Sequence, residues 1–155
     1  MEQLENMEEI EALQTELGQF LVSMMPVPWK KICYYAEVEP GCISPWISFI
    51  EQETEVICTE DFFWERYDHY PVRRRDVLIK LSNLTSVLHK AYIRRFGEDK
   101  KWCAMFYFIE EDYSVHIDLE YDFPKGDMFE QHDAVFRKIY HTEYKAIKGK
   151  YPATE

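Results

Sequence analysis

Four ionisable side chains alternate along one short segment and could together perform chemistry: His116, Asp118, Glu120 and Asp122. In a β-strand, alternate residues lie on the same face about 7 Å apart, so the four would form one row. Carboxylates beside an imidazole can hold a divalent metal or act as acid–base catalysts, and a small enzyme or metal-binding protein is one hypothesis. A single strand, however, spreads its side chains along a line, and no second His/Asp cluster nearby in the sequence completes a ligand shell. We therefore favour a solvated surface that a cationic partner recognises.

Residues 61–72 contain a dense group of aromatic side chains: Phe62, Phe63, Trp64, Tyr67 and Tyr70. Aromatic residues in such segments often cover a core beneath a loop. Mixed with acidic neighbours, Trp and Tyr also have the composition of hot spots in protein interfaces. The candidate partner-binding residues are therefore Trp64, Tyr67, Tyr70, Asp118, Glu120 and Asp122.

Fingerprints of the common cofactor and catalytic sites do not occur in the sequence. There is no GxGxxG, P-loop, GxSxG or HExxH motif. The four cysteines are separated by 9, 16 and 45 positions, which matches no CxxC zinc pattern. We expect the cysteines to be small buried hydrophobic residues. We expect no cofactor, no metal and no catalytic residue.

The composition is strongly acidic. The 155 residues include 29 Asp and Glu against 18 Lys and Arg, a formal net charge of −11. This charge repels phosphate, which argues against direct nucleic-acid binding and against an anionic membrane surface, and it favours a basic partner. The sequence has no apolar run long enough for a membrane span and no basic residue before Lys30. It therefore indicates a cytoplasmic protein with reduced cysteines.

The hydrophobic pattern predicts the elements that position these residues. Apolar residues at steps of three and four predict helices over 4–24 and 74–96, and Asp127 is a good cap for a third helix. Alternation at every second residue predicts five strands, over 29–38, 46–51, 54–59, 102–109 and 115–122.

These elements together predict the fold class. Both faces of residues 102–109 are apolar, which is typical of a central strand. Strands joined by short turns favour an antiparallel sheet. We therefore expect an α+β fold: a single domain over residues 1–155, with about five antiparallel strands and helices at the N-terminus, middle and C-terminus packed on the sheet.

Charge is distributed in blocks along the chain. Residues 1–29 and 102–122 each hold six acids and no Lys or Arg, whereas residues 73–101 hold nine bases and three acids. The simplest interpretation is that the basic segment pairs with acidic segments of its own chain or is solvated. A contact with a partner or with a second copy is the alternative, so a self-associating structural module, or a homodimer, stays open.

Several segments resemble the YezG-like antitoxins. The run PVPWKKICYYAEV, residues 26–38, is similar to their Pro-x-x-Trp followed by a Tyr-rich strand that ends in Ala-Glu-Val. The run YSVHIDLEYD, residues 113–122, resembles their last acidic strand. Residues 127–130 and 136–138 are similar to the opening of their final helix.

This resemblance implies a bacterial, cytoplasmic immunity protein of a toxin–antitoxin system. Such proteins bind and silence the nuclease domain of a toxin exported by a type VII-like secretion system. The implied partner is thus a basic nuclease toxin, and the implied activity is inhibition through protein–protein interaction without catalysis.

Overall fold

The computed structural model describes residues 2–59, 63–64, 66–122, 130, 134–135 and 137–139, with side chains from residue 7 onward. The elements follow in the order α1 (Glu2–Ser23), β1 (Trp29–Glu39), β2 (Cys42–Glu51), β3 (Ile57–Thr59), α3 (Arg74–Phe96), the short 3₁₀ helix η1 (Glu98–Lys100), β4 (Ala104–Glu110) and β5 (Val115–Glu120). None of the helices in these ranges is both long enough and apolar enough to cross a membrane.

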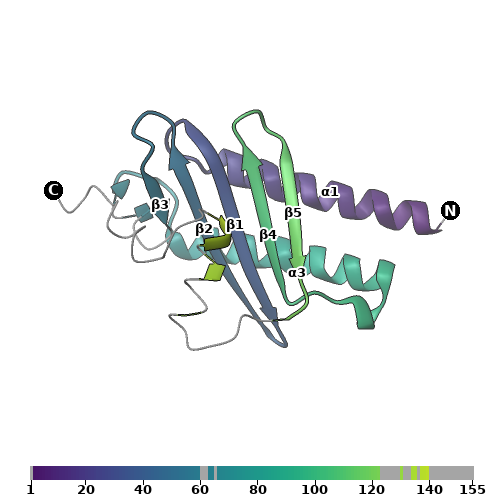
Figure 1. Cartoon of the computed structure of the whole chain (residues 1–155). Coiled ribbons are helices and arrows are strands. Elements are labelled where there is room, and N and C mark those ends of the chain that lie inside the picture. The colour runs from purple at the N-terminus through teal and green to yellow at the C-terminus, as the bar shows by residue number, and fades with distance from the viewer. Residues whose placement is uncertain are drawn as a thin grey trace.

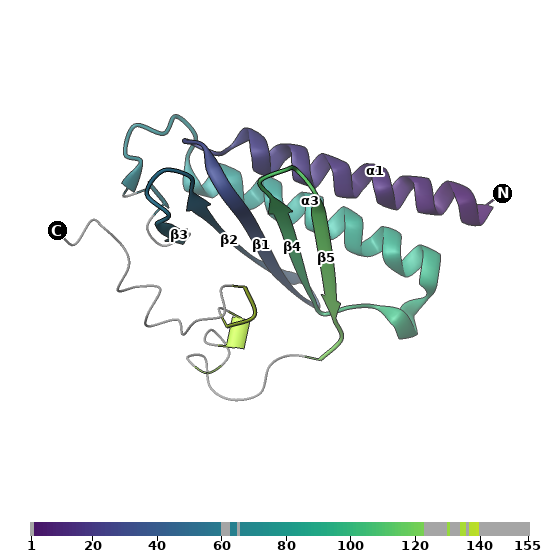
Figure 2. The same ribbon diagram turned by 45° about the horizontal axis from the view of Figure 1, so that its top comes forward.

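The strands form one antiparallel sheet in the order β3-β2-β1-β4-β5. The predicted α+β class, with an antiparallel sheet, is therefore confirmed. Helices α1 and α3 lie side by side against one face of the sheet (Figures 1 and 2). On the other face, Val135 and Ile139 are buried against the sheet.

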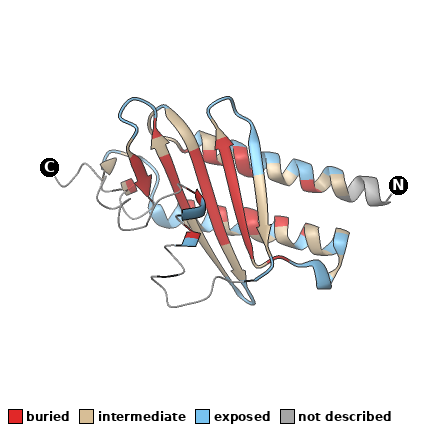
Figure 3. Cartoon of the chain, viewed as in Figure 1, coloured by how far each residue is buried: buried red, intermediate tan, exposed pale blue. Residues whose placement is uncertain are grey.

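Strands β1 and β4 bury side chains on both faces of the sheet, and Figure 3 shows them among the most deeply buried elements. On the helix side, the core includes Ile32, Tyr34, Ala36, Met105, Tyr107 and Ile109. On the opposite side, it includes Cys33, Tyr35, Ala104, Phe106 and Phe108. The alternation predicted from the sequence is thus confirmed, and β4 is a central strand between β1 and β5.

The predicted strand boundaries differ from the structure at several ends. Strand β2 begins at Cys42, four residues earlier than predicted, because it pairs with β1 along its whole length. Strand β3 begins only at Ile57, since residues 52–54 form a turn and Glu55 has a positive φ of 59°. The predicted helix start at Asp127 lies outside the described residues.

Trp102 lies on the other side of the sheet from the one that simple alternation predicts. The chain bends at Cys103, just before β4, so Trp102 joins the helix-side core while Ala104 faces the opposite side. Its indole packs edge-on against His89 and Tyr92, at centroid distances of 4.6 and 5.9 Å. Trp102 thereby closes the core between α3 and the start of β4.

The basic helix α3 packs alongside the acidic helix α1. Arg94 Nη2 lies 2.5 Å from Glu9 Oε1. Both side chains are partly exposed, so this ion pair adds little stability. It nevertheless supports the interpretation that part of the basic segment pairs within its own chain.

A buried hydrogen bond ties the sheet to α3. The Tyr34 hydroxyl and Thr85 Oγ1 are 2.6 Å apart, and both residues are almost fully buried. Burial, opposed by this hydrogen bond, raises the pKa of Tyr34 far above its usual value, so the phenol stays neutral. Thr85 was not predicted as a core residue, because a hydroxyl in a helix gives no hydrophobic signal.

We expect Thr85→Val to lower the free energy of unfolding by about 1–2 kcal/mol, because it leaves the buried Tyr34 hydroxyl without its close partner. The double variant Tyr34→Phe/Thr85→Val should lose clearly less than the sum of the two single losses, since it removes both polar groups. Urea denaturation of the four proteins measures this coupling. Thr15→Val, on the exposed face of α1, is the control and should change stability by less than about 0.5 kcal/mol. Strictly additive losses would contradict the pairing.

Candidate partner-binding surface

The predicted row of charged residues lies on strand β5, at one edge of the sheet. His116, Asp118 and Glu120 lie opposite Phe108, Phe106 and Ala104 of β4 in the strand register, on the side of the sheet away from the helices. Asp122 follows the strand and is exposed. The structure therefore brings the predicted charged contacts together along one edge.

The charges in this row are partly paired. His116 Nε2 lies 3.0 Å from Asp118 Oδ1. Lys138 Nζ lies 3.8 Å from Asp118 Oδ2 and also bonds the Glu120 carboxylate, while it sits 4.3 Å from the centroid of the Phe106 ring. Both carboxylate side chains remain 40% exposed. One lysine among three acids leaves the row net negative and accessible.

The arrangement does not support a metal site at His116. Its side chain is 66% exposed and forms an ion pair with Asp118 on the same strand. Within the described parts of the chain, no group of three or more His, Cys, Asp or Glu residues is placed to hold a metal ion. A row along one strand cannot surround an ion, which is the geometric reason that the sequence already suggested.

The hairpin between β4 and β5 adds exposed apolar side chains to the same edge. Tyr113 in the turn and Val115 at the start of β5 are 66% and 49% exposed, and Tyr121, which follows the far end of β5, is 54% exposed. None of the three is among the contacts predicted from the sequence. The turn is closed by hydrogen bonds from Tyr113 N–H to the Glu110 carbonyl oxygen, at 2.8 Å, and from Glu110 N–H to the Ser114 carbonyl oxygen, at 2.9 Å.

Tyr113 has a left-handed backbone, with φ of 68°. A side chain in this region is crowded by its own backbone, at a cost of order 1–2 kcal/mol, which is why Gly and Asn are usual there. Its ring packs edge-on against Trp29, at a centroid distance of 5.5 Å. A hairpin turn with neither Gly nor Asn was the sequence signal that could have drawn attention to this residue.

A groove of ≈ 500 Å³ runs between α1 and the β4–β5 hairpin. We name it the α1–β5 groove; it is lined by Gln14, Thr15, Gly18, Gln19, Val22, Ser23, Tyr107, Ile109, Tyr113 and Val115. The Tyr107 hydroxyl donates a hydrogen bond to the Gln14 carbonyl oxygen, at 2.7 Å. A Cβ atom at Gly18 would lie 2.5 Å from that hydroxyl, so only glycine lets α1 approach the sheet this closely.

The predicted aromatic anchors lie at the opposite edge of the sheet. Trp64, Tyr67 and Tyr70 surround the buried ring of Phe63 at centroid distances of 4.5, 5.5 and 5.1 Å. Phe63 in turn packs on Phe49 of β2, in the helix-side core. All three predicted anchors are half-buried. The structure thus does not place them beside the acidic row of β5.

The polar atoms of two of these aromatic residues are bonded within the chain. Trp64 Nε1 donates to the Val72 carbonyl oxygen at 2.9 Å, and the Tyr67 hydroxyl donates to the Glu51 carboxylate. Glu51 is 5% exposed and also accepts hydrogen bonds from Arg66 Nε and Nη2, at 2.5 and 2.6 Å. Burial would raise the pKa of Glu51, but the hydrogen bonds from Arg66 and Thr54 outweigh it, and its pKa lies below the usual value.

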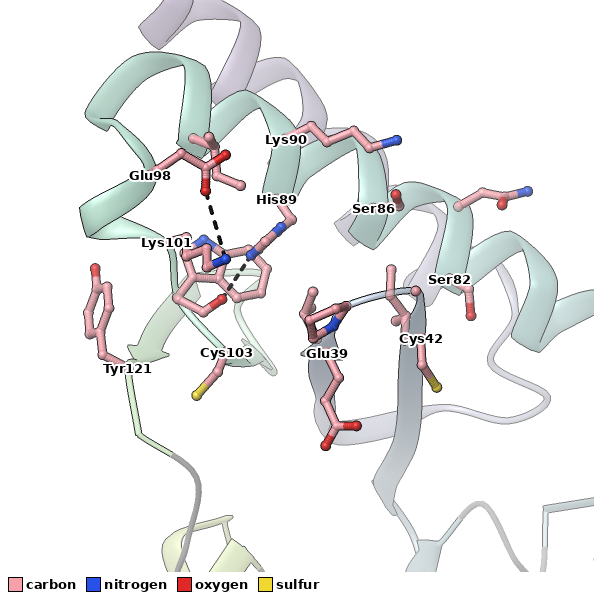
Figure 4. Close-up of a pocket in the computed structure, with 17 residues that line it drawn as sticks. Glu39, Cys42, Ser82, Ser86, His89, Lys90, Glu98, Lys101, Cys103 and Tyr121 are labelled. Atoms are coloured by element: carbon pink, nitrogen blue, oxygen red, sulfur yellow. Dashed lines mark hydrogen bonds and ion pairs between the residues drawn. The ribbon is translucent and has the colours of Figure 1, made fainter.

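A second cleft, of ≈ 790 Å³, opens between the β1–β2 hairpin, α3 and the start of β4 (Figure 4). Ser82, Ser86 and Lys90 follow one another along α3 on one wall. His89 Nε2 is hydrogen-bonded to the Trp102 carbonyl oxygen, at 2.8 Å. Burial raises the pKa of the Cys103 thiol, which disfavours the reactive thiolate. These contacts do not activate a nucleophile.

We expect Glu51→Gln to lower the free energy of unfolding by about 2 kcal/mol at pH 7, because Arg66 loses a charged acceptor in a buried site. The pKa of Glu51 is depressed in the folded state, so its contribution is complete above the ordinary value of 4.5 and is lost as pH falls through the folded-state pKa. The gap between wild type and Glu51→Gln should therefore narrow below pH 4.5. Denaturant titrations at several pH values measure it. Glu53→Gln, exposed two residues further on, is the control; an equal loss there would contradict the special role of Glu51.

The family model of the YezG-like immunity proteins matches residues 10–155. No curated protein matches the chain. The matched region spans nearly the whole sequence and includes every residue that lines the α1–β5 groove. The chain therefore belongs to the YezG-like family of immunity proteins.

Proposed function

We propose that this protein is an antitoxin that binds the basic nuclease domain of a cognate toxin and neutralises it by protein–protein interaction, without catalysis. In this proposal it acts in the bacterial cytoplasm and contacts no nucleic acid. The observation that carries the proposal is the exposed carboxylate row on β5 in a chain that belongs to an immunity-protein family.

The electrostatics of the chain support this partner. A nuclease must hold a polyanionic substrate, so it presents a basic surface. The inhibitor has a net charge of −11, and residues 102–122, which include β5, hold six acids without a single Lys or Arg. Opposite charges of this size steer the two proteins together and speed their association.

An edge strand is also a suitable place for a contact with another protein. No described strand pairs with the outer side of β5, so its carboxylates lie on the last strand of the described sheet. Charged side chains on an edge strand disfavour pairing between two copies of the same acidic chain. They do not disfavour a basic partner.

Trp64, Tyr67 and Tyr70 remain proposed anchors rather than assigned ones. They lie far from β5 in the strand order, and their half-burial against Phe63 gives them a role in the core. A toxin that binds them would contact the β3 edge of the sheet, so single alanine variants distinguish the two edges.

We expect the triple variant Asp118→Lys/Glu120→Lys/Asp122→Lys to reduce the association rate constant with the toxin encoded beside this gene by at least about tenfold at low salt. The difference should shrink as salt rises, because screening weakens the steering. Stopped-flow association and a nuclease-inhibition assay provide the measurements.

A control with the same change in charge is Glu53→Lys/Asp68→Lys/Asp76→Lys, at three exposed positions outside β5. It should retain inhibition and associate faster than the β5 variant. Full protection by the β5 variant would exclude this row as the contact. A wild-type protein that does not bind the neighbouring toxin at all would overturn the proposed function.

A further inference from the structure

Charge alone does not account for a tight complex. Complementary charges chiefly raise the association rate and select the partner, whereas apolar and aromatic anchors in pockets slow dissociation. We propose that the α1–β5 groove, with Tyr113 at its rim, holds one aliphatic or aromatic side chain from a Lys/Arg-rich segment of the toxin. This inference rests on the proposed function and adds an apolar anchor to its charged contact.

The groove has the floor of a side-chain pocket. Tyr107, Ile109 and Val115 extend from β4 and β5 toward α1, and Val22 contributes from the helix. The Tyr107 hydroxyl already donates a hydrogen bond to the Gln14 carbonyl oxygen, so it needs no acceptor from a ligand. Figures 1 and 2 both show the β4–β5 hairpin beside α1, with the open edge of the sheet next to it. An apolar side chain entering from that edge would meet mainly carbon.

The charge around the groove identifies the chemistry of the occupant. Helix α1 belongs to residues 1–29, and the hairpin belongs to residues 102–122; the two segments hold six acids each and no Lys or Arg. Glu11 continues the groove-lining stripe of α1, one turn before Thr15, and Asp112 lies beside Tyr113 in the hairpin turn. Lys31 of β1, which pairs with Glu110 at 3.5 Å, lies over the Phe108 ring on the other face of the sheet and does not line the groove. No described acidic side chain lines the groove itself, but a segment with Lys or Arg on both sides of an apolar residue would meet Glu11 on the α1 side and Glu111 and Asp112 on the hairpin side.

Tyr113 combines strain with exposure. It keeps a left-handed backbone at φ 68°, yet its ring is 66% exposed and packs only edge-on against Trp29. Strained residues concentrate at sites where function outweighs local stability. The ring lines the groove, and Glu111 and Asp112 directly precede it in the turn. It can therefore pack against the entering side chain and against a neighbouring cation.

A second copy of this chain is a poorer occupant. Two chains of net charge −11 repel each other, and the two segments that form the groove belong to acidic blocks of the sequence. The only strongly basic block, residues 73–101, lies on α3 and η1 and does not line the groove. Self-association through the groove is thus an outcome that the experiment must exclude.

The experiment uses the full-length protein and the toxin encoded beside its gene, with dissociation followed by surface plasmon resonance at low and high salt. Tyr113→Asn removes the ring but suits the left-handed backbone. Thr15→Trp fills the groove from an exposed position on α1. We expect both variants to dissociate at least tenfold faster at both salt concentrations. We expect Tyr113→Asn to keep the wild-type melting temperature or exceed it.

Ala12→Trp is the matched control, because it adds the same side chain at an exposed position on α1 that does not line the groove. It should dissociate like wild type. If both groove variants dissociate at the wild-type rate, this inference is overturned. The proposed function would still stand, because it is tested by the β5 charge variant. That variant changes the association rate, and its effect shrinks as salt rises. If Tyr113→Asn has a lower melting temperature than wild type, the dissociation rate of Thr15→Trp tests the inference instead. If the isolated protein forms a dimer and a groove variant makes that dimer dissociate, the groove binds a second copy of this chain and the inference is overturned.

Discussion

The structure depends on the burial of β1 and β4 on both faces. Tyr34 and Tyr107 point to the helices while Tyr35 and Phe106 point away, and all four are nearly inaccessible to water. The hydrophobic effect therefore requires a cover on each side of the sheet. Helices α1 and α3 supply one cover, and Val135 and Ile139 contribute to the other. Without both covers, the central strands would expose apolar faces to solvent.

Because both faces of the two central strands are covered, the row of charged side chains lies on an edge strand of the sheet. Strand β5 packs Ile117 and Leu119 against the helix-side core, and its alternate residues carry His116, Asp118 and Glu120 on the other side. One strand therefore serves both the core and the charged surface. This division is what a protein needs if it acts by occupying another macromolecule rather than by transforming a substrate.

Polar side chains fix how the layers sit on each other. The bond between Tyr34 and Thr85 joins the sheet to α3, and the bond from Tyr107 to Gln14 joins it to α1. Gln14 Nε2 also donates to the Tyr92 hydroxyl at 2.7 Å, which links the two helices. Hydrophobic contact is non-directional, whereas these bonds have defined geometry, so they specify the register of the helices on the sheet.

The local sequence determined which residues form helices and strands and which face of each is buried. The periods of 3.6 and 2 are properties of the chain itself, so α1, α3 and the alternation of β1 and β4 were predictable, as was the row of carboxylates on β5. The bend that reverses Trp102 was not, because the period stops at Cys103.

Only the tertiary structure decided which strands are neighbours. Pairing of β1 with β4 joins residues about seventy positions apart, and hydrophobic alternation says that a face is buried without saying by what. That pairing puts β5 at one edge and leaves Trp64, Tyr67 and Tyr70 at the other. Of the two groups that the sequence indicated as candidate contacts, one therefore lies on a charged surface and the other covers the core. It also places Tyr113 at the mouth of a groove whose other wall is α1, almost a hundred residues earlier in the chain.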